Sequence, residues 1–270
     1  MIMSVTATDC AGPNSPCMLK GELFQCMDHA RRLGFEGVEL HMRNAKLNDY
    51  HELAEFAKMN EIKVTSIGTG AAYSMDGYNL TAPDKESRKE AGQVLIDFLE
   101  AGHTLGGAAV MLGLMKGRFP NPKEKEKYMN ILEETLKPVV EAAEKYEFDL
   151  TLEAISRFWT DCLWTAEETL DFVNRFDSDR VTVHLDTFHM NIEEKDMEQA
   201  IRICKGKLGH MHLADSNRLY PGAGHFDFET CINTLYDIGY DKAAAFEYDA
   251  KPTGIEGAMK GLAHIKQFLR

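Results

Sequence analysis

The sequence contains no apolar run of about 18 residues, the length at which a helix becomes long enough to cross a bilayer. Its first residues (MIMSVTATDC) lack a basic segment followed by a long apolar one, so we expect no secretory signal. The six cysteines include no CxxC pair, and they are too few for a disulfide-rich scaffold. These absences predict a cytoplasmic protein with reduced, mostly buried thiols and no membrane contact.

Positive charge is scarce as well. Lysine and arginine number 30 against 43 aspartates and glutamates, which gives a formal net charge of −13 at pH 7. A protein that binds a phosphate backbone needs clustered basic residues, so this balance argues against nucleic acid as a partner. No P-loop pattern occurs, and no GxGxxG motif follows the first predicted strand. Linker-like and low-complexity segments are also absent, so residues 1–270 are expected to form a single domain.

What the sequence does contain is a regular alternation of short apolar runs and longer stretches of helical periodicity. Near-continuous apolar runs are typical of parallel strands that are covered on both faces. Eight such runs are predicted strands: Val5–Thr8, Gly37–His41, Lys63–Ile67, Ala108–Leu112, Leu150–Glu153, Thr182–Asp186, Gly209–Leu213 and Ala244–Tyr248. Eight strand–helix units in 270 residues fit an α/β protein with a closed (β/α)8 TIM barrel. An open, doubly wound sheet is the competing architecture.

Between the strands, two helices and two loops bear on the later argument. The clearest helix is predicted over Lys125–Tyr146, with a kink at Pro138. The last helix is expected to bury Met259, Leu262 and Ile265 on one side. The segments 70–83 and 115–123 are rich in Gly, Pro, Asn or aromatic residues and are expected to be loops at the mouth of the barrel. Such loops are either substrate walls or plain connectors.

Ionisable residues stand at the ends of four consecutive apolar strands. These residues are Glu153, Asp186, His212 and Glu247, and each follows the one before by about one strand–helix unit. In a barrel this spacing directs all four side chains to the carboxyl-terminal face, where catalytic residues lie. Three carboxylates converging there with an imidazole would repel one another without a cation. Oxygen and nitrogen ligands of this kind suit Mn²⁺, Mg²⁺, Co²⁺ or Zn²⁺.

Each of these residues alone also has an ordinary structural explanation. A carboxylate at a strand end is commonly a helix cap or an ion-pair partner, and a histidine in an apolar strand is commonly a hydrogen-bonded core residue. The recurrence at barrel spacing is what favours a functional site. His184 and His210 alternate to the same face as the ligand candidates and either support them or merely pack. Glu39 and His41 end the second strand, and the sequence favours a structural role for them.

The second half of the chain also carries specific motifs. They are LE at 152–153 with RF at 157–158, HLDTFHMNIE at 184–193, HLADSNR at 212–218, PGAGHFDF at 221–228 and FE at 246–247. In these segments the chain resembles the xylose-isomerase-like barrels, specifically the ketose 3-epimerases and related sugar isomerases. The first half shares only their strand–helix rhythm.

This resemblance implies a metal-dependent sugar epimerase or isomerase. In such enzymes the residues matching Glu153, Asp186, His212 and Glu247 bind one divalent metal, usually manganese. The two matching Glu153 and Glu247 form an acid/base pair on opposite faces of the sugar. Loss of a proton beside the ketone gives an enediolate, and a metal stabilises its charge. Family members are often dimers or tetramers, so the resemblance also implies a homo-oligomer.

The residues expected to contact the substrate include one departure from the family. His189 and Arg218 match residues that contact the oxygens near the substrate carbonyl. In the ketose 3-epimerases a glutamate follows Arg-Phe and hydrogen-bonds the sugar near its first carbons, whereas this chain has Trp159 there. Either the local loop has shifted, or the substrate differs at that end and carries a bulky or aromatic group that Trp159 contacts.

Two further enzyme classes resemble this barrel. The catalytic subunits of C-glycoside deglycosidases act on 3-oxo-glycosides with a bound divalent metal and would need a small partner subunit. Apurinic endonucleases use a larger set of ligands for three zinc ions and a basic surface that faces DNA. The net charge of −13 and the single set of four ligand residues argue against the endonuclease. Several arginines and lysines, among them Arg157 and Lys116, are near the expected mouth, so a phosphorylated sugar also stays open.

Overall fold

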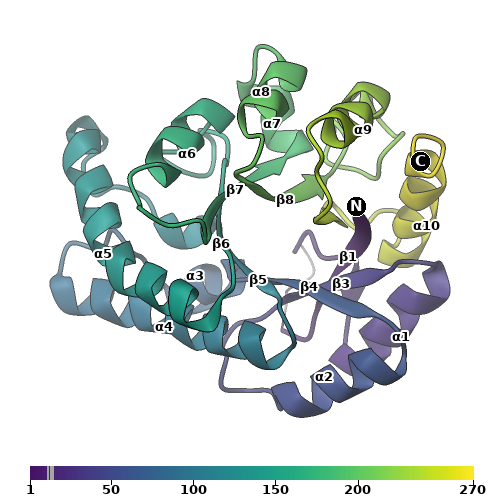
Figure 1. Ribbon diagram of the computed structural model, residues 1–270, viewed down its shortest axis with the longest axis horizontal. Helices are drawn as coiled ribbons and strands as arrows, with labels where there is room; N and C mark the ends of the chain where they lie inside the picture. The colour runs from purple at the N-terminus through teal and green to yellow at the C-terminus, as the bar shows by residue number, and fades with distance from the viewer. Residues whose placement is uncertain (11, 13–14) are drawn as a thin grey trace.

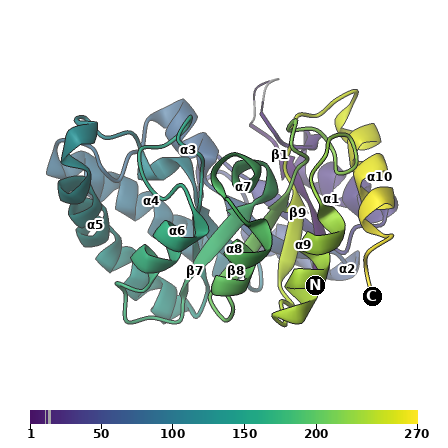
Figure 2. The ribbon, with the colours of Figure 1, turned by 90° about the horizontal axis from the view of Figure 1, so that it is seen from above.

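The computed structural model describes residues 1–10, 12 and 15–270. Parallel strands form a ring with the helices outside it (Figure 1), and in the view turned by 90° the strands run between helices on either side (Figure 2). The strands follow one another in the order β1-β3-β4-β5-β6-β7-β8-β9, and β9 pairs with β1 to close the ring. The short strand β2 pairs with the last two residues of β1, beyond the part that pairs with β9. The predicted TIM barrel is therefore confirmed.

The helices and strands have the following bounds in the structure. The strands are β1 (Ile2–Thr8), β2 (Leu19–Lys20), β3 (Gly37–His41), β4 (Lys63–Gly68), β5 (Ala109–Leu112), β6 (Leu150–Glu153), β7 (Val181–Asp186), β8 (Leu208–Leu213) and β9 (Ala243–Phe246). The α-helices are α1 (Leu23–Leu33), α2 (Tyr50–Met59), α3 (Gly70–Asp76), α4 (Lys85–Thr104), α5 (Lys125–Tyr146), α6 (Ala166–Val173), α7 (Thr187–Glu193), α8 (Met197–Ile203), α9 (Phe228–Asp237) and α10 (Gly254–Ile265). Two short 3-10 helices are η1 (Leu114–Lys116) and η2 (Pro122–Glu124).

The predicted strands and the longest helix agree closely with these bounds. All eight predicted strands are present, and α5 spans Lys125–Tyr146 with Pro138 inside it, as predicted. Strands β6 and β7 are buried along their whole length, which explains why an unbroken apolar run identified them. In the described part of the chain no helix is long and apolar enough to cross a membrane.

The two segments expected to be plain loops contain helices. Residues 70–83 include α3, and residues 115–123 include parts of η1 and η2. Helix α3 is followed by its C-cap Gly77, which has a left-handed conformation (φ 76°). The N–H of Gly77 donates hydrogen bonds to carbonyls in the last turn of the helix. Because α3 packs against η1, contacts distant in sequence support two elements too short for a periodic pattern.

The expectation for the last helix is wrong at one position. Leu262 and Ile265 are buried as predicted, but Met259 is 55% exposed. Helix α10 begins at Gly254, and its buried side consists of small and apolar residues (Gly257, Ala258 and Gly261) together with Leu262 and Ile265. Small residues let the helix approach the barrel closely, and this leaves Met259 on the outer side.

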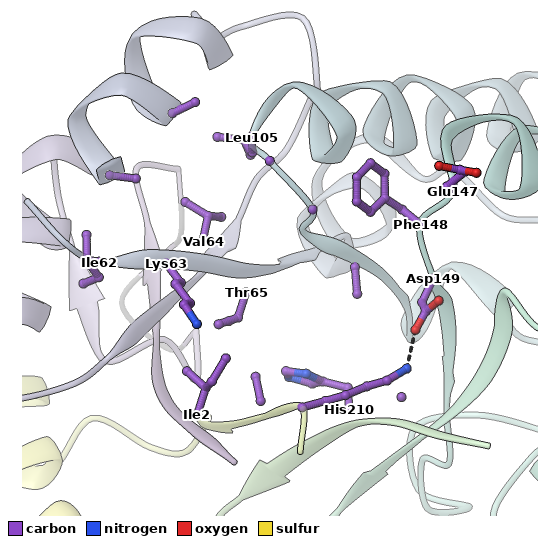
Figure 3. Close-up of a pocket in the computed structure, with 18 of the residues that line it drawn as sticks. Ile2, Ile62, Lys63, Val64, Thr65, Leu105, Glu147, Phe148, Asp149 and His210 are labelled. Atoms are coloured by element: carbon purple, nitrogen blue, oxygen red, sulfur yellow. Dashed lines mark hydrogen bonds and ion pairs between the residues drawn. The ribbon is translucent and has the colours of Figure 1, made fainter. Parts of the chain in front are cut away.

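The amino-terminal end of the barrel has a cavity of about 720 Å³ (Figure 3). It is lined by the strand starts Ile2 and Lys63 and, at its floor, by His210. Lys242 and Asp149, which also line the cavity, form an ion pair. This cavity is at the opposite end of the strands from the residues predicted to be functional.

Candidate metal centre and active site

Strands β6, β7, β8 and β9 bring the four predicted ligand residues together. Glu153 and Asp186 are the last residues of β6 and β7, His212 is the penultimate residue of β8, and Glu247 directly follows β9. One ligand atom from each lies within 4.8 Å of the others. The Nδ1 atom of His212 is 3.4 Å from Glu247 Oε2 and 3.9 Å from Asp186 Oδ2. The convergence expected from the barrel spacing is therefore present.

Local structure fixes the direction of the two carboxylates at the ends of β6 and β7. Asp186 caps α7, and its Oδ1 accepts a hydrogen bond from the N–H of Phe188 at 2.7 Å, which leaves Oδ2 free to face the cluster. Glu153 lies against Gly113, where an added Cβ would be 2.5 Å from Glu153 Oε2. The buried amine of Lys116 donates to the main-chain carbonyl of Glu153. The absence of a side chain at Gly113 leaves room for the Glu153 carboxylate, and the hydrogen bond from Lys116 fixes the main chain of Glu153.

The two glutamates differ in their electrostatic surroundings. Burial raises the pKa of Glu153 to about 8, and the neighbouring Glu247 and Asp186 carboxylates act in the same direction. Burial would also raise the pKa of Glu247, but the adjacent His212 outweighs it and lowers the pKa to about 2. Burial raises the pKa of Asp186 to about 6. In the metal-free protein at neutral pH, one glutamate therefore holds a proton while the other is ionised, the division that acid/base pairs need.

The cluster has the properties of a divalent-cation site. Asp186 Oδ2 and His212 Nδ1 are both buried and have no hydrogen-bond partner among the described residues. Buried polar atoms are normally paired, so two orphaned ligand atoms facing one another indicate a missing partner. Three carboxylates and an imidazole offer donors that Mn²⁺, Mg²⁺, Co²⁺ and Zn²⁺ all accept. The residues present fit a divalent metal without selecting one.

A cavity of about 620 Å³ opens above the cluster. Glu153, His212 and Glu247 line it, together with the three predicted substrate-binding residues Trp159, His189 and Arg218. Residues of α3 and η1 form part of its wall, so the segments that follow β4 and β5 are walls of the cavity rather than mere connectors.

The three predicted substrate residues contact one another in this wall. The guanidinium of Arg218 lies over the rings of Trp159 and Phe188, 5.3 and 4.8 Å from their centroids. The Nη1 atom of Arg218 and Nδ1 of His189 are buried and have no hydrogen-bond partner in the described part of the chain. Burial and the nearby Arg218 lower the pKa of His189 to about 3, so its imidazole is neutral. A neutral imidazole and a cation thus line the cavity with unpartnered nitrogen atoms.

In the structure Glu39 contacts His212, one of the four predicted ligand residues, although the sequence favoured only a structural role for Glu39. Glu39 is fully buried, and its Oε1 lies 2.6 Å from His41 Nε2 and 2.9 Å from His212 Nε2. Its Oε2 lies 2.7 Å from His210 Nε2. A carboxylate inside an otherwise apolar strand was a usable signal, because such a strand should be buried on both faces. His184 packs its ring against His210 and His212 with centroids 4.9 and 4.2 Å apart.

Four of the basic residues expected near the mouth are paired with acidic ones. Arg157 pairs with Glu193 at 2.5 Å, and Glu193 is nearly buried at the end of α7. Further pairs join Arg43 to Asp76, Arg118 to Asp161 and Lys251 to Asp249. Each guanidinium or amine in these four pairs already faces a carboxylate, so none of the four is an unpaired cation that a phosphate group could bind.

A closed barrel with a carboxylate–imidazole cluster at the carboxyl ends of its strands is typical of a TIM-barrel enzyme with a divalent-metal site. The sequence model of the xylose isomerase-like TIM barrel family matches residues 27–268. The chain therefore belongs to this family, as the motifs predicted.

Individual relatives narrow the class further. The D-psicose 3-epimerase of Enterocloster bolteae is 33% identical over 233 residues, which cover 82% of this chain and 75% of that protein. The L-ribulose 3-epimerase of Mesorhizobium japonicum is 30% identical over 234 residues, 84% of this chain and 76% of that one. The structure of D-psicose 3-epimerase with D-tagatose from Clostridium cellulolyticum superposes with a TM-score of 0.85 at 25% identity, covering 100% of both chains. The protein is an enzyme of the isomerase or epimerase kind.

Proposed function

We propose that this protein is a divalent-metal-dependent epimerase of a keto sugar, which inverts a carbon beside the carbonyl by removing a proton and returning it to the other face. The observation that carries this proposal is the pair Glu153 and Glu247, two carboxyl groups at the ends of β6 and β9 that line the same cavity. Two such groups let one carboxyl deliver a proton while the other accepts one. The similarity to 3-epimerases supports the same reaction class.

We assign two residues of the cavity to proton transfer and two to substrate binding. Glu247 takes the proton beside the carbonyl, and Glu153 delivers one to the opposite face. In the reverse reaction the two exchange roles. His189 and Arg218 bind the oxygens near the carbonyl through their unpartnered nitrogen atoms. The buried cavity floor excludes bulk water, which strengthens each of these polar contacts.

Glu153, Asp186, His212 and Glu247 would hold one divalent metal ion, for which we propose Mn²⁺ ahead of Mg²⁺, Co²⁺ or Zn²⁺. When bound, the cation would stabilise the negative charge that develops on the substrate oxygens as the proton leaves. By the resemblance to the family we also propose a cytoplasmic homo-oligomer, either a dimer or a tetramer, and light scattering on the purified protein would test its size.

Proton exchange tests the acid/base pair directly. Glu153→Gln and Glu247→Gln should each slow exchange of the substrate proton beside the carbonyl with D₂O by about 10²–10⁴-fold, measured by NMR on a panel of free ketoses. Glu133→Gln, on the outer side of α5 where Glu133 pairs with Arg175, is the matched control and should exchange at the wild-type rate. Unchanged exchange in both active-site variants would rule out the assignment.

One observation favours a second candidate, which acts on a larger molecule. A cavity of about 620 Å³ is in the range that drug-sized ligands fill, and Trp159 is 39% exposed in its wall. A 3-oxo-glycoside, whose aglycone would contact Trp159, fits both facts, and its enolisation could end in elimination as in the C-glycoside deglycosidases. Incubation with free ketoses and with 3-oxo-C-glycosides separates the two, because the first reaction yields an epimer and the second a free aglycone. The second would also require a small partner subunit.

A further inference from the structure

Glu39 lies in the barrel interior directly beneath the candidate metal centre. Its carboxylate is fully buried, with Oε1 facing His41 and His212 and Oε2 facing His210. The hydroxyl of Ser66, on the neighbouring strand β4, donates to Oε2 at 2.7 Å. Four polar side chains from three strands thus surround one carboxylate.

The burial of this carboxylate is unfavourable in free energy. An ionised carboxylate loses several kcal/mol of hydration when it is buried, and hydrogen bonds recover only part of that cost. Packed apolar side chains at the same positions would often be at least as stable. Stability alone therefore does not account for a carboxylate at this place.

The contact with His212 gives Glu39 a direct link to the metal centre. A carboxylate can only accept hydrogen bonds, so at 2.9 Å the Nε2 atom of His212 carries the hydrogen and donates it to Glu39 Oε1. In the neutral ring, which is the form that binds a metal, the lone pair is then on Nδ1. That atom faces Glu247 Oε2 and Asp186 Oδ2 and has no other partner in the described part of the chain.

We propose that Glu39 is the positioning residue of His212: it fixes the Nε2–H form of the imidazole and its ring orientation, so that Nδ1 is presented to the divalent cation. Carboxylates in this position behind a metal-binding histidine raise its basicity and commonly contribute 10–100-fold to metal affinity. This role rests on the metal site proposed above. His41 and Ser66 occupy the remaining lone pairs and hold the carboxylate in the direction that His212 requires.

The same side chains could be taken for a second metal site. Glu39, His41 and His212 lie close enough together to be ligands, as do His184, His210 and His212. Glu39 Oε1, however, is already at hydrogen-bond distance from both His41 and His212, at 2.6 and 2.9 Å. The geometry therefore favours a hydrogen-bonded support for one metal, and predicts a stoichiometry of one ion per chain.

The test uses Mn²⁺ alone, without sugar, so that it is independent of catalysis. The purified protein is stripped with chelator and titrated with Mn²⁺ by calorimetry, for the wild type, Glu39→Gln and Ser66→Ala. Glu39→Gln should weaken Mn²⁺ binding by about 10–100-fold, with wild-type circular dichroism in the metal-free state. Ser66→Ala removes a donor to the other carboxylate oxygen but leaves Oε1 in contact with His212, so it should change the affinity less than about 3-fold.

A spectroscopic measurement separates positioning from a merely structural role. The ¹⁵N shifts of histidine in the metal-free wild type, recorded at a pH where the His212 ring is neutral, should place its hydrogen on Nε2, and Glu39→Gln should give a mixture of the two neutral forms. A folded Glu39→Gln variant that binds Mn²⁺ as tightly as the wild type would overturn the role of Glu39. A hydrogen on Nδ1 of His212 in the wild-type protein would also overturn it, and this result does not depend on whether the variant folds. Two ions per chain would also overturn it. If the wild type binds no Mn²⁺, the proposed metal site itself is excluded. Absence of substrate proton exchange would contradict the proposed reaction but would not bear on the metal site or on the role of Glu39.

Discussion

Glu153 has room for its carboxylate because residue 113 carries no side chain. An alanine at residue 113 would meet a steric obstacle. The obstacle is the Glu153 carboxylate, with its Oε2 2.5 Å from the position of the new Cβ, and Ile155 Cδ1 is at 3.4 Å.

We therefore predict that Gly113→Ala displaces Glu153 and lowers kcat by about 10²-fold, because a misplacement near 1 Å costs that much at a reacting group. Steady-state kinetics on the best ketose of the panel, with circular dichroism as a check of folding, measure it. The control is Gly70→Ala in the wall of the same cavity, where an added Cβ has nothing within 4 Å. Equal activity of Gly113→Ala and wild type would show that Glu153 is not held by this contact.

Asp215 holds the loop that carries Arg218. Its carboxylate accepts backbone N–H bonds from Ser216, Gly222 and Phe226 at 2.7, 2.8 and 3.1 Å. Burial would raise the pKa of Asp215, but these N–H groups outweigh burial and hold it below the usual 3.8. Because the folded pKa is depressed, the stabilisation is complete above pH 3.8 and is lost as the pH falls through the folded pKa.

Asp215→Asn should accordingly lower the free energy of unfolding by about 1.5–3 kcal/mol at pH 7, the usual contribution of hydrogen bonds to a charged group. The difference between wild type and variant should shrink as the pH is lowered below 3.8. Urea unfolding of both proteins in chelator at several pH values measures this difference and leaves out the metal. A difference that stays constant down to pH 2.5 would contradict the linkage.

At the scale of single elements, helix α5 continues through a proline. Pro138 is exposed within the 22 residues of α5, and its ring nitrogen cannot donate to the carbonyl of Glu134 one turn earlier. Packing of the apolar side of α5 against its neighbours, helix α4 among them, keeps the helix continuous.

Replacing this proline should restore the missing hydrogen bond without touching the core. Pro138→Ala is predicted to raise the free energy of unfolding by up to about 3 kcal/mol, the difference between the two residues in a helix interior. Lys137→Ala at the adjacent exposed position should change it by less than about 0.5 kcal/mol. Urea unfolding monitored by circular dichroism compares the three proteins, and a destabilised Pro138→Ala would show that the ring contributes packing.

The elements also show what can be read from local sequence. Strands such as β7, buried along their whole length, require an unbroken apolar run, and the run located them to within two residues. Helix α5 is long enough for its periodicity to be unambiguous. By contrast, α3 has seven residues and β2 has two, too few for either periodicity, and both depend on neighbours distant in sequence.

For the whole molecule, the candidate metal site joins residues from four consecutive strands, β6 to β9. Cation binding to the folded state alone stabilises the fold by about 2.7 kcal/mol when the free ion is at 100 times its Kd. For a chain of this size each kcal/mol raises Tm by about 2–4 °C.

Addition of Mn²⁺ to the chelator-treated protein should therefore raise Tm by about 5–10 °C at that concentration. Asp186→Asn should abolish the rise, because asparagine keeps an acceptor for the N–H of Phe188 but lacks the charge that binds the cation. Scanning calorimetry or fluorimetry with and without Mn²⁺ gives the comparison. The same Tm in chelator and in Mn²⁺ would exclude a metal site in the folded protein.

The sequence by itself determined the barrel and the four residues at its strand ends. Apolar runs and helical periodicity are local properties, and barrel closure then brings Glu153, Asp186, His212 and Glu247 to one face whatever the loops do. Only the tertiary structure decided which polar residues support them. Glu39 and Lys116 look like isolated charges along the chain, and become neighbours of His212 and Glu153 because folding joins strands far apart in sequence. The pKa values of the two glutamates arise in the same way, since burial and neighbouring charges exist only in the folded barrel.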